Sequence, residues 1–156
     1  MYQIEKKIEQ LDFGVVEFPN IISTEGLGPC IGIVVAWKHT GLIYHATDPY
    51  MEAETTEEFL SECKRRIPIP DRHKVLTILC GSLIDSSDDS KTTRRARKFI
   101  YTELIKAGFT APIQKWNSIQ KSGHKIVINL GENNVTLYRQ VECDEEIDRW
   151  AISPAH

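Results

Sequence analysis

A cysteine and a histidine occur in this sequence in a setting that suits nucleophilic catalysis. Cys30 follows the glycine-framed segment Gly26-Leu27-Gly28-Pro29, and His45 comes one short predicted hairpin later. A cysteine attacks as the thiolate, so it needs a nearby base or a group of backbone N–H donors that favours ionisation. These residue types in this arrangement indicate a cysteine amidohydrolase built around Cys30 and His45.

The segments that carry these two residues predict a β-hairpin. Ile31–Trp37 is a nearly continuous β-branched run, which is typical of a strand covered on both faces. Residues 38–41 then predict a turn, and residues 42–46 predict the returning strand. Because an antiparallel hairpin brings the start of one strand beside the end of the other, we expect Cys30 and His45 at the same edge of a sheet.

The remaining elements follow from apolar periodicity and turn residues. A capping-box pattern at Thr55-Thr56-Glu57-Glu58 predicts the start of a helix that ends before Pro68, and residues 91–107 predict a longer helix after a polar loop at 85–90. Residues 144–152 are a candidate short helix. Further strands are predicted at residues 12–18, 21–24, 74–80, 110–116, 124–130 and 135–141. Strands at both ends around two helices describe an α/β or α+β sandwich with a mixed sheet.

Length and composition set the broad class. The 156 residues fit one domain, residues 1–156, and the apolar fraction of 41% and charged fraction of 26% are ordinary for a soluble globular protein. The formal charge of −3 argues against a general nucleic-acid or anionic-membrane binder. No apolar run approaches the roughly 20 residues that cross a bilayer.

Cysteine usage bears on the compartment. The four cysteines show no C-x-x-C spacing, and the first residues lack the apolar core of a signal peptide. We therefore expect free thiols and a cytoplasmic location, although a bacterial effector delivered into a host cell without a classical signal would have the same sequence features.

Two segments resemble a known family. The stretch Thr24-Glu25-Gly26-Leu27-Gly28-Pro29-Cys30-Ile31-Gly32 resembles the T-x-G-L-G-S-C-V turn of the CheD family of chemoreceptor glutamine deamidases. The stretch Gly41-Leu42-Ile43-Tyr44-His45-Ala46-Thr47-Asp48-Pro49 resembles that family's G-x-x-x-H-x-x-x-P segment. Weaker similarity covers most of the chain.

The resemblance implies an αββα-type sandwich, shared with toxin deamidases of the cytotoxic necrotizing factor class, and a Cys-His-Thr site. It assigns Cys30 as nucleophile, His45 as base and Thr24 as the third residue. Backbone N–H groups of the turn between Gly28 and Ile31 would then hold the oxyanion. The implied reaction is hydrolysis of a glutamine side-chain amide on a chemoreceptor in chemotaxis, or on another protein, without a cofactor or a metal.

Other interpretations stay open. The domain could be a CheD-like binding or regulatory module, since CheD proteins also bind a CheC-type phosphatase. A cysteine protease or a small-molecule amidase is a weaker alternative. Taken alone, Cys30 could be a packing residue, and His45 could be a core histidine bonded to a carbonyl.

Several further sequence patterns give only weak evidence of function. Gly26-x-Gly28 precedes a strand and does not link a strand to a helix, so it lacks the geometry that cradles phosphate. The other histidines and cysteines lack metal-ligand spacing. A basic cluster near the predicted second helix fits a solvated face or contact with an acidic protein patch, and no interleaved aromatic residues indicate nucleic acid; it comprises Arg94, Arg95, Arg97 and Lys98.

Overall fold

Two five-stranded β-sheets packed face to face form the centre of the computed structural model, which describes residues 2–84 and 90–153. The first sheet has the order β1 (Glu5–Lys7), β3 (Ile21–Leu27), β8 (Gly123–Asn129), β9 (Asn134–Gln140) and β10 (Asp144–Ala151). The second has the order β2 (Phe13–Glu17), β5 (Thr40–Ala46), β4 (Ile31–Trp37), β6 (Leu76–Gly81) and β7 (Ile113–Trp116). Both sheets are mixed, because β1 pairs with β3 and β6 with β7 in parallel while the other pairs are antiparallel.

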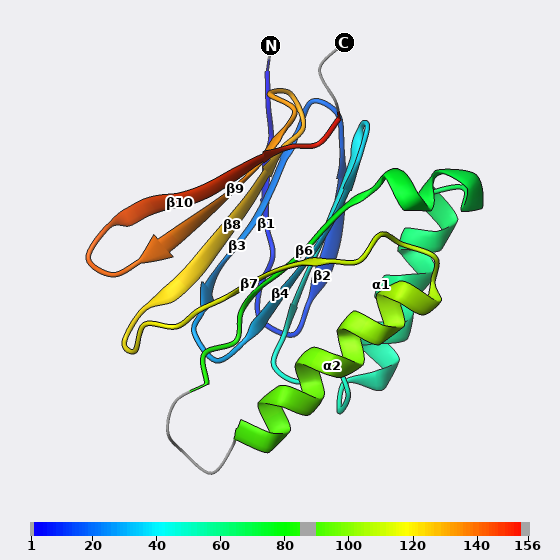
Figure 1. Ribbon diagram of the computed structural model, residues 1–156. Helices are drawn as coiled ribbons and strands as arrows, with labels where there is room; N and C mark the ends of the chain where they lie inside the picture. The colour runs from blue at the N-terminus through cyan, green and yellow to red at the C-terminus, as the bar shows by residue number, and fades with distance from the viewer. Residues whose placement is uncertain (1, 85–89, 154–156) are drawn as a thin grey trace.

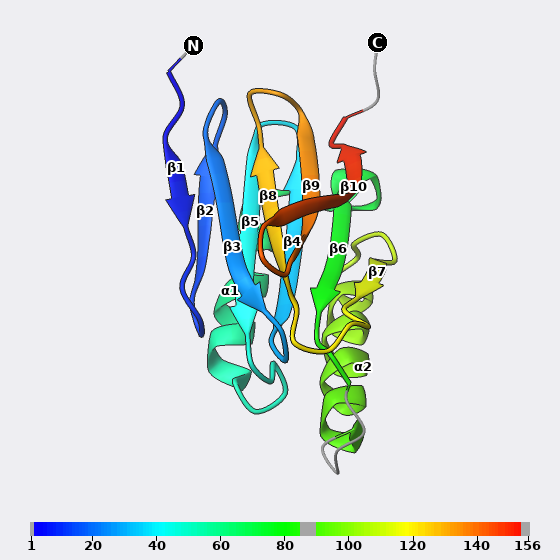
Figure 2. The same cartoon turned by 90° about the vertical axis from the view of Figure 1, so that its left-hand side faces the viewer.

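The helices cover one face of the second sheet. These are α1 (Ala53–Arg66), the short 3₁₀ helix η1 (Ile69–Lys74) and α2 (Ser90–Lys106). Figures 1 and 2 show α1 and α2 side by side on the side away from the first sheet. The predicted α+β class and the mixed sheets are therefore confirmed. The layer order of the described residues is αββ and differs from the αββα order that the resemblance implies, because both helices lie on the same face of the second sheet and the outer face of the first sheet carries no helix.

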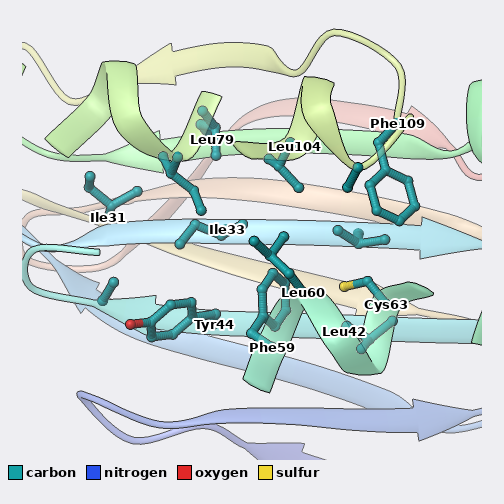
Figure 3. Packing of buried hydrophobic residues seen from close by; sticks show 14 of the residues in the cluster. Ile31, Ile33, Leu42, Tyr44, Phe59, Leu60, Cys63, Leu79, Leu104 and Phe109 are labelled. Atoms are coloured by element: carbon teal, nitrogen blue, oxygen red, sulfur yellow. The ribbon is translucent and has the colours of Figure 1, made fainter. Parts of the chain in front are cut away.

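The second sheet separates two hydrophobic cores. On its helix side, alternate residues of β4 and β5 such as Ile33 and Tyr44 pack against Phe59 and Cys63 of α1 and Leu104 of α2 (Figure 3). Cys63 is fully buried in this core as a small apolar residue.

The other core lies between the two sheets. There Val34 of β4 and Ile43 of β5 meet residues of β3, β8 and β9, including Ile22, Ile126 and Leu137. Strands β4 and β5 are covered on both faces, which explains their nearly unbroken apolar sequences. In β5 the alternation places Tyr44 on the helix side, so its neighbour His45 faces the first sheet.

Two predicted details are wrong. The tail is the edge strand β10 and not a helix, because residues Asp144 to Ala151 pair along β9. The first helix begins at Ala53, two residues before the predicted capping box, with Glu52 at the N-cap position. Thr56 lies inside the helix, where its hydroxyl donates to the Pro49 carbonyl at 2.9 Å.

The other predicted elements are present with small changes at their ends. The strand predicted at 21–24 is longer and continues to Leu27, while the predicted second helix begins at Ser90. The predicted loop at 85–90 lies outside the described residues except for Ser90. None of the helices in the described ranges is long and apolar enough to span a bilayer.

The central strand β4 should dominate stability. Replacing Ile33, which is fully buried, by alanine should lower the free energy of unfolding by about 2–5 kcal/mol, because the lost methyl groups leave a cavity between β4 and the helices. The same substitution at Ile69, which is 74% exposed, serves as the control and should change stability by less than about 0.5 kcal/mol. Urea unfolding followed by circular dichroism measures both, and equal effects would contradict the assignment of the core.

Candidate active site

A hydrogen bond between the two sheets holds His45 in place. The Thr24 hydroxyl oxygen on β3 lies 2.7 Å from Nδ1 of His45 on β5. Both side chains are almost completely buried, at 2% and 4% exposure. The structure thus brings two of the predicted catalytic residues into direct contact, and it does so through the side chain of Thr24.

The surroundings of Thr24 determine the tautomer of His45. The Thr24 hydroxyl also lies 2.7 Å from the carbonyl oxygen of Ile8, which can only accept a hydrogen bond. A hydroxyl has one proton, so Thr24 donates it to Ile8 and accepts a hydrogen bond from Nδ1–H of His45. Nε2 of the neutral ring then carries a free lone pair, which is the state required of a general base.

Cys30 lies at the same sheet edge and on the same face as His45. The register pairs Gly32 with His45 and Ile31 with Ala46, and its continuation places Cys30 opposite Thr47. The Cys30 sulfur indeed lies 3.8 Å from the Thr47 hydroxyl. Cys30 and His45 are therefore diagonal neighbours across the hairpin, an arrangement that separates Cβ atoms by roughly 7 Å.

The thiol and the imidazole are not hydrogen-bonded to each other. Nε2 of His45 is buried and has no hydrogen-bond partner among the described residues. The prediction of a shared edge is confirmed, whereas a formed nucleophile–base contact is not present. A buried ring nitrogen without a partner carries a desolvation cost, so a hydrogen-bond donor that reaches Nε2 would be favoured there.

The electrostatic environment keeps both groups neutral. Burial raises the pKa of the Cys30 thiol; the Thr47 hydroxyl lowers it, and the negative charge of Glu52 raises it further. Burial lowers the pKa of His45, against smaller opposing contributions from Glu52 and Glu9. A preformed thiolate–imidazolium pair is therefore disfavoured.

Glu52 organises the loop that follows β5. One carboxylate oxygen accepts hydrogen bonds from the backbone N–H groups of Thr47 at 3.0 Å and Asp48 at 2.6 Å. The other accepts the Tyr44 hydroxyl at 2.8 Å. This carboxylate thus fixes Thr47, the residue that contacts the thiol, to the first turn of α1.

The turn that presents Cys30 is supported from behind by the end of β6. Ser82 N–H donates to the Cys30 carbonyl at 2.7 Å, and Leu83 N–H donates to the Gly28 carbonyl at 2.8 Å. Gly81 has φ of +73°, and a Cβ there would lie 2.4 Å from the Cys30 carbonyl oxygen, so only glycine fits.

Two side chains hold this support. Nδ1 of His124 accepts the Gly81 N–H at 2.9 Å. Arg97 donates to both the hydroxyl and the carbonyl of Ser82, with its guanidinium 4.3 Å from the centre of the Trp116 ring. The predicted basic cluster is therefore partly structural, because Arg97 serves the turn behind Cys30 and Arg95 pairs with Asp48 at 3.2 Å.

The predicted oxyanion donors differ in their surroundings. His45 makes its backbone hydrogen bonds to the chain before β2, donating to Asp12 at 3.0 Å and accepting from Leu11 at 2.8 Å. The backbone N–H and C=O groups of successive residues in a strand point to opposite neighbouring strands. The backbone groups of Ala46 therefore point to β4, where the Ala46 carbonyl accepts the N–H of its partner Ile31. The Ile31 N–H therefore belongs to the sheet, while Gly28 stays a predicted donor on the turn.

A cleft of about 260 Å³ reaches the Thr24–His45 pair. Its walls come from the segment after β1 and from β3, and they carry charges of both signs; the charged residues lining it are Lys7, Glu9, Glu25 and Lys125. Cys30 does not line this cleft. The cleft therefore approaches the site from the imidazole side and suits a polar group.

Sequence reasoning missed the residues that complete the site. Thr47 could have been found by extending the hairpin register one step beyond Ala46. No local signal marks Glu52 or Ser82, because each reaches the site through another element. Tyr44 and Asp48, which flank the predicted base, serve packing and an ion pair.

Neither a protein-family model nor a curated protein sequence matches this chain. Within residues 2–84 and 90–153, no three His, Cys, Asp or Glu side chains gather in a group that could hold a metal ion. All four cysteines are free thiols, and Cys143 is the exposed one.

Thiol labelling tests the electrostatic environment of Cys30. At neutral pH, iodoacetamide should modify Cys143 before Cys30, because burial and Glu52 disfavour the Cys30 thiolate. Glu52→Gln should speed Cys30 labelling by removing the negative charge, and Glu62→Gln elsewhere on α1 is the matched control. Mass spectrometry over a pH series reads each cysteine. Faster labelling of Cys30 than of Cys143 in the native protein would show that the thiol is already activated.

His124 should make stability depend on pH. Burial, with a contribution from Arg139, lowers its pKa from 6.5 to about 4. The unfolded chain therefore binds a proton that the folded protein refuses, and stability should fall as pH drops from about 6.5 to about 4, by at most about 1.4 kcal/mol per pH unit. His124→Asn keeps an acceptor for the Gly81 N–H and should reduce this slope by the contribution of His124, leaving that of His45, whose pKa is also lowered by burial. Urea unfolding of both proteins at several pH values makes the comparison, and parallel curves would contradict it.

Proposed function

We propose that the chain is a cysteine-dependent amidohydrolase that converts glutamine side chains of a protein substrate to glutamate, with release of ammonia. One observation carries this proposal. The Thr24–His45 hydrogen bond leaves a buried, unpartnered Nε2 on the face and at the strand end where Cys30 lies. A fixed imidazole with a free lone pair beside a thiol is the arrangement that nucleophilic catalysis by cysteine needs.

The reaction begins with a proton transfer. Nε2 of His45 takes the Cys30 proton as the sulfur attacks the glutamine amide carbon, which forms a C–S bond and a tetrahedral oxyanion. Backbone N–H groups of the turn around Gly28 stabilise that oxyanion. Collapse breaks the C–N bond, His45 returns the proton to the departing ammonia, and a thioester with Cys30 remains.

Hydrolysis of the thioester completes the cycle. Nε2 of His45 removes a proton from water as the water oxygen attacks the thioester carbon; the C–S bond then breaks, and Nε2–H returns the proton to the departing sulfur. The products are glutamate and the Cys30 thiol. Thr24 keeps the same role throughout, since its acceptance of Nδ1–H leaves Nε2 as the atom that gains and loses the proton.

The neutral resting state fits a mechanism in which substrate binding brings the thiol to its base. The Cys30 thiol has to leave Thr47 and meet Nε2, and substrate binding has to drive this step. The resting thiol is thereby protected from adventitious reaction. A protein substrate suits the position of the site at the loop end of the sandwich, beside a cleft with polar and charged walls. A chemoreceptor is one such substrate, and the free thiols support the cytoplasm as the compartment.

A second candidate function is a binding or regulatory module with the same fold. This candidate is supported by the Cys30 side chain, which is only 5% exposed and within hydrogen-bond distance of the Thr47 hydroxyl, and by the raised pKa of its thiol. In this proposal the loop end would bind a regulatory protein partner without chemistry. Binding of that partner would survive Cys30→Ala, and no glutamine of the partner would change.

Incubation with a bacterial lysate and with its tryptic peptides in ¹⁸O-labelled water tests the enzyme proposal. Enzymatic deamidation incorporates ¹⁸O at specific glutamines, which mass spectrometry maps. Cys30→Ser and His45→Gln should each lower this incorporation by at least about a hundredfold. Thr24→Ser, which keeps the hydroxyl, should retain most activity, whereas Thr24→Val should lose it.

Two results would count against catalysis by this site. One is the same pattern of ¹⁸O incorporation with native protein and with Cys30→Ser. The other is equal activity of Thr24→Ser and Thr24→Val, which would remove the assigned role of the hydroxyl. Urea unfolding of each variant separates lost activity from lost folding.

A further inference from the structure

A larger pocket lies at the opposite end of the sandwich from Cys30 and His45. Its volume is about 750 Å³, within the range of pockets that bind small molecules. Strand β4 begins at the candidate site with Ile31 and ends at this pocket with Trp37, so the two places are about 20 Å apart. The pocket is therefore separate from the proposed chemistry. The β4–β5 and β8–β9 turns, which contribute lining residues, lie at the same end of the sandwich as the start of β1 and the end of β10 (Figure 2).

The pocket has an apolar floor and aromatic walls. Leu130 and Ile152, at 2% and 6% exposure, close it where the core between the sheets ends. Trp37 lines it, and so does Phe18, which is 45% exposed although it is a large aromatic residue. The Phe18 ring packs edge-on against His39 at 5.1 Å between centroids. An exposed aromatic wall over a buried aliphatic floor favours a flat apolar ligand.

The charge at the rim is positive. Lys38 and Lys74 line the pocket, and the described residues that line it include no aspartate or glutamate. The Lys38 ammonium lies 4.7 Å from the centre of the Trp37 ring and has no carboxylate within 4.0 Å among the described residues. Lys74 lies 3.7 Å from Asp71, so its charge is partly balanced. Of the two lysines that the structure describes at this rim, Lys38 is therefore the one whose ammonium can meet an anion above the aromatic wall.

The wall formed by the first sheet is held by paired hydrogen bonds. The Asn133 side chain donates to the Ser153 carbonyl and accepts the Ser153 N–H, both at 3.2 Å. The Asn133 carbonyl accepts the Ile152 N–H at 3.1 Å. The β8–β9 turn is thereby fixed to the end of β10, so the pocket exists before any ligand binds. Preformed walls lower the entropic cost of binding.

From these features we propose that this pocket binds a small organic acid with a flat apolar body, such as an aryl-alkanoate. The apolar body lies on Leu130 and Ile152 between Trp37 and Phe18, and the carboxylate accepts a hydrogen bond from the Lys38 ammonium. This inference is independent of the deamidase proposal, since the described residues that line the pocket do not include Thr24, Cys30 or His45.

Displacement of 8-anilinonaphthalene-1-sulfonate, a fluorescent aromatic anion, tests the proposal with the full chain. We expect the dye to bind and 4-phenylbutyrate to displace it at least about tenfold better than 4-phenylbutan-1-ol, the factor given by one charge-assisted hydrogen bond. Lys38→Glu and Phe18→Ser should each raise the concentration of 4-phenylbutyrate needed to displace the dye. Cys30→Ser should leave this concentration unchanged. Lys64→Glu on α1 makes the same change in net charge as Lys38→Glu and should have no effect.

Three results would overturn the proposal. The first is no dye binding to the native protein. The second is equal displacement by the alcohol and the acid, which would mean an uncharged apolar ligand. The third is an equal effect of Lys38→Glu and Lys64→Glu, which would mean attraction by net charge alone. Because both lysines are exposed, neither substitution threatens folding.

Discussion

The hydrogen bond between Thr24 and His45 is the interaction on which the candidate site depends. It connects β3 of one sheet to β5 of the other beside the mostly apolar core between the sheets. A polar pair in such a place is stable only when its hydrogen bonds are satisfied, and the Ile8 carbonyl supplies the remaining partner. The stacking of the two sheets thereby fixes the orientation and the tautomer of one imidazole.

A second constraint comes from charge. The Glu52 carboxylate anchors the loop after β5, yet its negative charge opposes ionisation of the neighbouring thiol. The same residue thus builds the site and keeps it in a neutral resting state. This combination separates the two candidate functions in physical terms. An enzyme has to form the Cys30 thiolate during attack although the Glu52 charge disfavours it. In a binding module the same charge keeps the thiol at this loop end unreactive.

The sequence was informative where local pattern decides structure. The apolar run of β4 and the turn after Trp37 were enough to predict the hairpin, and the hairpin alone places Cys30 and His45 at one edge. The roles of Ile8, Glu52 and Ser82 could not be predicted, because each reaches the site from an element distant in sequence or through a backbone group. The predicted capping box, which begins at Thr55, is wrong because the helix starts earlier, at Ala53, with Glu52 at the N-cap position. The family resemblance and the catalytic roles derived from it stay predictions.

Strand β10 gives the acidic tail segment a different meaning. Asp144, Glu145 and Glu146 resemble the first turn of a helix, but they form the outer edge of the first sheet, where the pairing with β9 shifts register after Glu146. An outer strand offers unpaired backbone groups to other chains, and a run of carboxylates together with an irregular ladder makes that edge a poor template for them. The residues that obscured the secondary structure thus protect the protein from self-association through strand addition.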